Sequence, residues 1–324
     1  SALSRELAAP ALALARSKTA DIVRLAIEIA RVPAPTGQER ARAGLIASLL
    51  KDQGLIEVQA DEISNVVGRI PGHMSGPPLL VAAHSDTVFP LDTPLQPGLA
   101  EGKAFGPGIG DNSLGVAAAV SLPRLFEELG FRPAVDVLIT GNVGEEGLGN
   151  LRGIRRVMDD RPNIGAVIAV EGHNLGRVTH VAVGSRRLKV RVTGEGGHSW
   201  GDFGASNAIH GAAEIIHELC RIPLPANPKT TLNVGVIEGG TSINTIASQV
   251  WFNLDLRSVE AFALRRLSDR VDRVLSTHRK GLDVTVDVVG DRPAGVVPPD
   301  CRLVRLAVEV LEELGIQPAG DASS

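Results

Sequence analysis

The chain has 324 residues, 22% of them charged and 44% hydrophobic, with a formal net charge of −4, and this length accommodates two domains with substantial cores. The small negative charge without a basic block argues against nucleic acid as a partner, and no apolar run approaches the roughly 20 residues of a membrane-spanning helix. Two cysteines, Cys220 and Cys301, are too few for a disulfide framework and suit a reducing compartment, so we predict a cytoplasmic location.

The first half of the chain alternates helical and strand patterns. Apolar residues recur at helical spacing over residues 21–31, 38–53 and 113–129. Short apolar runs of the kind that form strands buried on both faces occupy residues 78–83, 135–143 and 164–170. This alternation predicts an α/β domain in which helices cover both faces of a mostly parallel sheet.

The pattern changes near Gly184. Residues 187–193 alternate polar and apolar side chains, as a strand with one solvated face does. A helix, two strands, a second helix and a last strand are then predicted at 205–220, 230–238, 249–256, 261–279 and 282–289. This β-α-β-β-α-β order is that of a ferredoxin-like α+β unit. We predict an inserted lid domain at 185–291, and a first domain made of 1–184 and 292–324 that includes a returning helix at 302–314.

Polar side chains follow each of the three apolar runs of the first half. They are His84 and Asp86 after the first run, Glu145 and Glu146 after the second, and Glu171 after the third. Ligands of open α/β sheets bind outside the carboxyl ends of the strands. We therefore expect these side chains to converge on one cleft.

The residue types in these pairs suit a metal site. His84 and Asp86 point the same way at a strand end, so the carboxylate can orient the imidazole. Glu145 and Glu146 are adjacent and must diverge, so one can bind a metal while the other acts as a general base. Taken alone, each pair is also compatible with a surface loop or a solvated turn.

A further acid, Asp111, ends the glycine-rich turn that begins at Gly106. Asp111 could simply stabilise the turn. A carboxylate at this position can also bridge two ions with its two oxygens. The candidate ligands supply nitrogen and oxygen atoms suited to Zn²⁺, or to Co²⁺ or Mn²⁺. They are His84, Asp111, Glu146 and Glu171.

The order of these residues resembles the M20 family of metallopeptidases and aminoacylases, including its glutamate carboxypeptidase-like members. The resembling segments of the first domain are His84-Ser85-Asp86, residues 106–111, Glu145-Glu146 and Glu171-Gly172. Those of the lid are residues 196–199, 239–244 and 255–257. The resemblance covers nearly the whole chain and implies a metal-dependent amidohydrolase whose inserted lid is a dimerisation domain.

The resemblance also implies a role for each candidate residue of the first domain. Asp111 would bridge two zinc ions. His84 and Glu171 would bind the first ion, and Glu146 would bind the second. Glu145 would be the general base.

Further roles follow from the same resemblance. Asp86 would orient the imidazole beside it. His198 of the lid would reach into the active site of the partner subunit and stabilise the developing oxyanion, which implies a homodimer through the lid. Asn244, Arg257 and Arg292 match positions that hold the substrate, and arginine suits a substrate carboxylate. A plain structural ion pair stays open as the alternative for Arg257.

Two features depart from the family pattern. The usual Asp-x-Lys-Gly stretch reads Asp111-Asn112-Ser113-Leu114-Gly115 here. The family also takes its last metal ligand from a histidine near the C-terminus, whereas no histidine follows His278. We therefore expect that the sequence is truncated and lacks a C-terminal segment after Ser324.

We predict from these observations a zinc-dependent hydrolase that cleaves an amide bond in a small peptide or an N-acyl amino acid. One alternative is a dimeric scaffold of the same family that binds such a molecule without cleaving it. Another is a nucleotide-binding protein, because a glycine-rich turn at 106–110 opens a helix. Asp111 argues against it, since the acid stands where a phosphate would meet the helix N-terminus. His173 fits either an approach to the cleft or a loop role.

Overall fold

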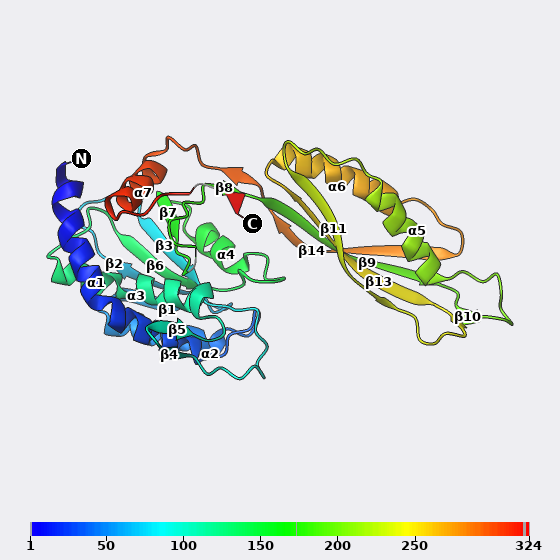
Figure 1. The fold of residues 1–324 in the computed structure, drawn as a ribbon, viewed down its shortest axis with the longest axis horizontal. Helices are drawn as coiled ribbons and strands as arrows, with labels where there is room; N and C mark the ends of the chain where they lie inside the picture. Colours follow the sequence, from blue (N-terminus) through cyan, green and yellow to red (C-terminus); the bar gives the residue numbers. More distant parts are fainter. Residues whose placement is uncertain (1, 173, 320–321, 324) are drawn as a thin grey trace. The chain divides into compact units, whose positions relative to one another are not determined.

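The computed structural model describes residues 2–172, 174–319 and 322–323, which form two compact units (Figure 1). Of these described residues, the first unit contains those up to Gly176 together with Glu309–Gln317. The second contains Arg177–Val308 and the described residues from Pro318 on. Within the described part of the chain, the helices are too short or too polar to cross a bilayer.

The first unit is built on a five-stranded mixed sheet. In spatial order its strands are β1 (Ile56–Ala60), β2 (Val66–Ile70), β6 (Val137–Asn142), β3 (Leu79–His84) and β7 (Ala166–Ala169). β3 pairs in parallel with both β6 and β7, whereas β2 pairs antiparallel with β1 and β6. β3 and β6 are buried along almost their whole length, as their Val, Leu, Ile and Ala content predicts.

Helices cover both faces of this sheet. On one face are α1 (Ala2–Ala30), α2 (Arg40–Asp52) and α3 (Leu114–Glu128), and on the other is α4 (Arg152–Asp160). Because successive side chains of a strand point to opposite faces, Val81 packs into the first core and Leu80 into the core beneath α4. Each fully buried side chain of this size stabilises the fold by roughly 1.5–3 kcal/mol.

The prediction that residues 164–170 form a strand buried on both faces is wrong in one respect. β7 is the last strand in the order of the sheet, and Val167 and Ile168 are 37% and 38% exposed. It pairs on one side with β3, so fewer neighbouring elements cover its apolar side chains. Glu171, which follows it, is exposed as well.

The second unit is a four-stranded antiparallel sheet with two helices on one face. The strand order is β11 (Thr230–Gly239), β13 (Gln249–Ser258), β9 (Gly184–Gly194) and β14 (Leu282–Arg292), and the helices are α5 (Ala208–Cys220) and α6 (Ala261–Leu275). The Asn207 side chain accepts hydrogen bonds from the first backbone N–H groups of α5 and so caps that helix. The chain order and strand order are those of the predicted ferredoxin-like unit.

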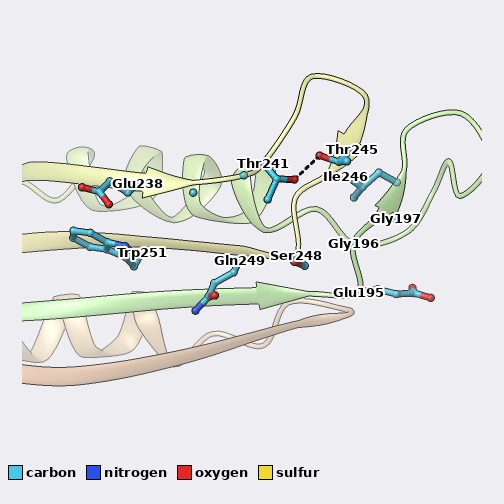
Figure 2. Close-up of a pocket in the computed structure, with 12 residues that line it drawn as sticks. Glu195, Gly196, Gly197, Glu238, Thr241, Thr245, Ile246, Ser248, Gln249 and Trp251 are labelled. Carbon is cyan, nitrogen blue, oxygen red and sulfur yellow. Dashed lines mark hydrogen bonds between the residues drawn. The ribbon is translucent and has the colours of Figure 1, made fainter.

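Short elements complete the description. They are β4 (Gly98–Ala100), β5 (Lys103–Phe105), the π-helical turn η1 (Ile109–Ser113), β8 (Val181–Ala182), β10 (Gly197–His198), β12 (Thr245–Ile246), β15 (Gly295–Val296), α7 (Arg302–Glu313) and β16 (Ala322–Ser323). β4 and β5 form a hairpin, and β10 pairs with β12. In the second unit, residues of β10, β12 and the adjoining parts of β11 and β13 line a pocket of about 730 Å³ (Figure 2).

The predicted fold class is confirmed: the chain combines an α/β sheet unit with a separate α+β unit. The α/β sheet is mixed, because β1 and β2 run antiparallel to their neighbours. The domain boundaries at 184/185 and 291/292 stay predictions.

Candidate functional site

Strands of the first unit bring the candidate residues to one edge of the sheet. His84 is the last residue of β3, and it is only 4% exposed. β3 runs parallel to β6 and β7, with His84 opposite Asn142 and Ala82 opposite Ala169. Because the carboxyl ends of parallel strands share an edge, the segments that follow β6 and β7 meet beside His84. His173, which also follows β7, lies outside the described residues.

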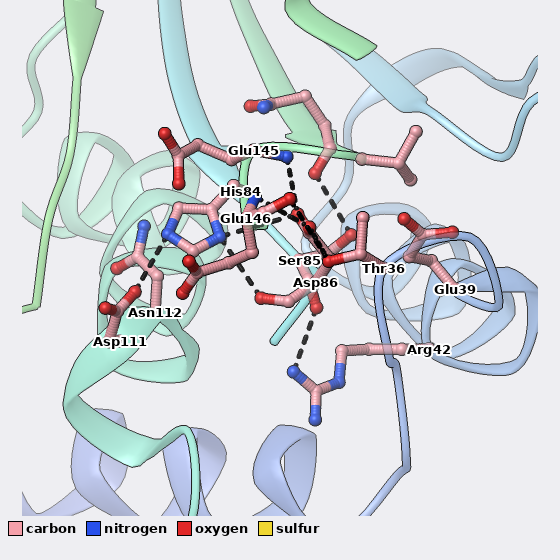
Figure 3. Close-up of polar contacts among 12 residues, drawn as sticks. Thr36, Glu39, Arg42, His84, Ser85, Asp86, Asp111, Asn112, Glu145 and Glu146 are labelled. Carbon is pink, nitrogen blue, oxygen red and sulfur yellow. Dashed lines mark hydrogen bonds and ion pairs between the residues drawn. The ribbon is translucent and has the colours of Figure 1, made fainter. Parts of the chain in front are cut away.

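The imidazole of His84 lies among acidic side chains (Figure 3). Its Nε2 atom is 3.0 Å from Oδ1 of Asp111 and 3.7 Å from Oε2 of Glu171. Ligand atoms of these three residues lie within 4.8 Å of one another, and so do those of His84, Glu145 and Glu146. The structure therefore brings all five residues together, while their assignment as ligands or base stays a prediction.

The charges of this cluster favour a bound cation. Burial of His84 opposes its protonation, but contacts with Asp111 and other acids outweigh burial and raise its pKa to about 12. Burial, together with repulsion from Asp111 and Glu145, raises the pKa of Glu146 to about 6. A divalent cation would relieve this repulsion, and the mixed nitrogen and oxygen donors are those of zinc, cobalt or manganese sites. The residues present thus fit a metal.

Asp86 is 0% exposed and connects the imidazole to the acidic segment after β6. Its carboxylate accepts hydrogen bonds from the backbone N–H of Glu145 (3.0 Å), the N–H of Glu146 (3.0 Å) and the Thr36 hydroxyl (2.8 Å). Burial raises its pKa, but contacts with His84 and these donors outweigh it and lower the pKa to about 2. The Nδ1 atom of His84 is 3.2 Å from the backbone oxygen of Asp86 and 3.6 Å from Oδ1. Asp86 therefore holds the acidic segment as well as contacting the imidazole, and the first of these roles is absent from the sequence prediction.

Arg42 bonds the segment that carries Asp86 (Figure 3). It is also absent from the predicted site residues. Its side chain is 1% exposed and donates a hydrogen bond to the backbone oxygen of Ser85 (2.9 Å). Burial lowers its pKa to about 10 despite the attraction of Asp86, so the guanidinium stays charged and offsets the buried carboxylate. The sequence does carry a signal: Arg42 continues the buried stripe of Ile46 and Leu50 on α2.

The Asn65 side chain joins the two ends of the loop that carries Glu145 and Glu146. This buried side chain accepts a hydrogen bond from the Val143 N–H (3.1 Å) and donates one to the backbone oxygen of Gly153 (3.1 Å). The positions of Glu145 and Glu146 therefore depend on a polar residue that comes much earlier in the chain.

The second unit places His198 in an exposed turn region at the end of β10. Its Nδ1 atom accepts hydrogen bonds from the backbone N–H groups of Trp200 (3.2 Å) and Gly201 (3.3 Å). A neutral imidazole whose Nδ1 accepts carries its proton on Nε2, which is then a hydrogen-bond donor. This tautomer suits a residue that stabilises an oxyanion, and the role stays a prediction.

The two candidate arginines of the second unit lie on two strands and face the same residue of the strand between them. Arg257 of β13 and Arg292 of β14 are both opposite Ser185 of β9. Residues in register project from the same face of a sheet, so the two arginines share a face. Nε of Arg257 donates to Oδ2 of Asp255 (2.7 Å), so the ion pair that the sequence left open is present. The proposed contact with substrate stays a prediction for both arginines.

Asn244 lies in the exposed turn between β11 and β12. Its side-chain oxygen accepts a hydrogen bond from the Ser242 hydroxyl, and its backbone oxygen accepts one from the Ser199 N–H (3.0 Å). Asn244 and His198 therefore belong to one local cluster of turns. The pocket of Figure 2 is lined by neighbouring residues, among them Glu195 and Trp251, and not by these two.

Two family profiles match the chain. One, described as the peptidase dimerisation domain of M20, matches residues 182–283. The other, described as peptidase family M28, matches residues 65–192. The first match covers most of the four-stranded unit, and the second includes the strand ends around His84.

Related sequences and structures agree with these matches. A succinyl-diaminopimelate desuccinylase of Gluconacetobacter diazotrophicus is 27% identical over an alignment 322 residues long, which covers 92% of this chain and 82% of the relative. Carboxypeptidase G2 of a Pseudomonas species is 27% identical over 262 residues, which cover 78% of this chain and 61% of the relative. Together these findings support an M20 family metallopeptidase or aminoacylase. A tripeptidase structure from Staphylococcus aureus shares the fold of this chain, with a TM-score of 0.75, 21% identity and coverage of 94% of this chain and 84% of that one.

Proposed function

We propose that this chain is a zinc-dependent hydrolase that cleaves an amide bond in a small peptide or an N-acyl amino acid. The related sequences and structures are peptidases and desuccinylases, which supports an amidohydrolase. The observation that carries the proposal is the buried imidazole of His84, around which carboxylates from separate chain segments gather. Burial and repulsion from Asp111 and Glu145 raise the pKa of Glu146, and a divalent cation would relieve that repulsion.

Four residues would hold two ions. His84 and Glu171 would bind the first ion, Glu146 would bind the second, and Asp111 would contribute to both. When bound, zinc lowers the pKa of a water molecule and polarises the carbonyl of the substrate. Cobalt or manganese fits the same donors.

Glu145 is the proposed general base. It takes a proton from the attacking water and returns that proton to the leaving amine as the C–N bond breaks. Asp86 supports this step, because its carboxylate accepts the hydrogen bond of the Glu145 N–H. His198 is proposed to donate its Nε2 proton in a hydrogen bond to the developing oxyanion.

The substrate class and the assembly are also part of the proposal. The desuccinylase among the relatives supports an N-acyl amino acid, and carboxypeptidase G2 supports a substrate with a free carboxylate. Arg257 and Arg292 share a face of the sheet and suit that carboxylate, with Asn244 as a further polar contact. The match to a dimerisation domain supports a homodimer in which His198 serves the active site of the partner subunit.

The proposal is tested by combining metal analysis with a substrate panel. The full chain is analysed for bound metals and assayed on N-succinyl and N-acetyl amino acids and on di- and tripeptides. We expect hydrolysis of one of these classes, its loss after chelation, and its return when zinc is added. If zinc-treated protein binds no metal and cleaves none of them, the hydrolase proposal is wrong and the non-catalytic scaffold is favoured.

A further inference from the structure

The side chain of Asn112 binds the backbone on both sides of Glu171. Asn112 is 1% exposed. Its Nδ2 donates a hydrogen bond to the backbone oxygen of Val170 (2.7 Å), and its Oδ1 accepts one from the Gly172 N–H (2.9 Å). The one residue between these two contacts is Glu171.

These two bonds follow the donor and acceptor pattern of one residue in a parallel β-ladder. In a strand, the C=O of one residue and the N–H of the second residue after it point to the same side, where a parallel neighbour bonds both. The carboxamide of Asn112 offers a donor and an acceptor side by side and takes the place of that neighbour. The Val170 N–H bonds the backbone oxygen of Ala82 in β3 (2.8 Å). The segment before Glu171 is therefore bonded both to β3 and to Asn112.

Two glycines leave room for this contact. A Cβ atom at Gly115 would lie 2.0 Å from Oδ1 of Asn112 and 2.8 Å from the backbone oxygen of Val170. A Cβ atom at Gly172 would lie 2.4 Å from the backbone oxygen of Gly110. Larger residues at either position would push apart the two segments that Asn112 joins.

We propose that Asn112 is a positioning residue that fixes Glu171 relative to Asp111, so that both carboxylates reach one cation beside His84. The inference rests on the proposed function, because it takes Asp111 and Glu171 as ligands. Their side chains are 51% and 43% exposed, so burial alone does not set their positions. Asn112 is the covalent neighbour of one acid and bonds both neighbours of the other, so it sets the distance between them.

The chemistry requires a carboxamide at this position. An aspartate would present two acceptors and would repel the Val170 oxygen, and a leucine of similar size would leave the Val170 oxygen and the Gly172 N–H without this partner. Residues that orient metal ligands through such contacts typically change metal affinity by about 10–100-fold when they are replaced.

The test measures metal binding in the full chain. Zinc affinity is determined by competition titration, and the visible spectrum of the cobalt form reports the ligand geometry. We expect Asn112→Leu to weaken zinc binding about 10–100-fold and to change the cobalt spectrum. The matched control is Val120→Ala, a buried truncation on α3, which should lower the Tm and leave both metal readouts unchanged.

Gly115→Ala is the second variant, because it keeps Asn112 and only fills its space. Alanine favours a helix more than glycine does, so this change would stabilise α3 if the contact did not matter. We expect weaker zinc binding here too. If Asn112→Leu does not fold, this variant alone tests whether Asn112 positions Glu171.

Two results distinguish a failure of this inference from a failure of the proposed function. If both variants bind zinc as the unaltered chain does and give its cobalt spectrum, the role of Asn112 is overturned and the proposed function stands. If the unaltered chain itself binds neither ion, the proposed function fails and takes this inference with it.

Discussion

The candidate residues of the two units are held in place in different ways. In the first unit, His84 and Asp86 are 4% and 0% exposed, and their partners come from distant segments of the chain. In the second unit, His198 and Asn244 lie on exposed turns, and their side chains bond residues close to them in sequence, such as Trp200. Substitutions of the buried candidate residues of the first unit should therefore change stability and chemistry together, whereas substitutions of the exposed candidate residues of the second unit should change chemistry alone.

The largest effect is expected for Asp86→Ala. The change leaves the N–H groups of Glu145 and Glu146 and the buried Arg42 without their carboxylate, so the free energy of unfolding should fall by about 3 kcal/mol and hydrolysis should be lost. Urea unfolding and a hydrolysis assay measure both. Asp86→Asn, which keeps the size and one acceptor, is the control and should lose less stability. If Asp86→Ala were as stable as the unaltered chain, the expectation that buried candidate residues of the first unit stabilise the fold would be wrong.

Glu145→Gln should separate chemistry from structure within the first unit. The amide cannot accept the proton of the attacking water, so kcat should fall by about 10²–10⁴-fold while metal content and Tm are retained. Glu146→Gln is the matched control, because it alters a proposed ligand and should lower metal content instead. Hydrolysis at the original rate in Glu145→Gln would show that the base is a different group.

His198→Ala tests the second half of the comparison. Loss of an oxyanion donor should lower kcat by about 10²–10³-fold. The free energy of unfolding should stay within about 0.5 kcal/mol, because the side chain is exposed. His217→Ala, at another exposed histidine of the same unit, should leave both quantities unchanged. A marked loss of stability in His198→Ala would contradict the distinction between the units.

The smallest effect is expected for Trp200→Ala. The side chain is 88% exposed, and the contact with His198 uses the backbone N–H, which alanine keeps. Stability should therefore change by less than about 0.5 kcal/mol, and kcat should stay near that of the unaltered chain. A drop in kcat at unchanged stability would show that the indole ring itself contacts the substrate or a partner, and would sharpen the account of this surface.

The sequence predicted the meeting of the candidate residues in the first unit for a simple physical reason. His84, Glu145 and Glu171 follow apolar runs, and parallel strands end at the same edge of a sheet. The ferredoxin-like order of the second unit was equally readable from alternating polar and apolar residues. An apolar run does not indicate whether its strand lies at the centre or at the edge of the sheet. The sequence therefore did not predict that side chains of β7 are exposed.

The supporting residues were not predictable in the same way. Asn112 bonds Val170, 58 positions further along the chain, and Thr36 bonds Asp86, 50 positions further along. A buried polar side chain is specified by a partner that only the tertiary fold brings near, and its local pattern resembles that of any loop or turn residue. Arg42 is the exception, because a charged residue within the apolar stripe of a helix already indicates a buried partner.

The short connections after β6 and β7 limit how the chain can vary in length. Only residues 143–144 lie between the end of β6 and Glu145, and only Val170 lies between the end of β7 and Glu171. One inserted residue would displace a carboxylate by about 3.3 Å, far beyond the tolerance of a ligand bond. The hairpin of β4 and β5 has no such restriction, since its tip connects two strands that carry none of the candidate residues. Insertions and deletions that preserve the chemistry should therefore be accepted at the hairpin and rejected at the two strand ends.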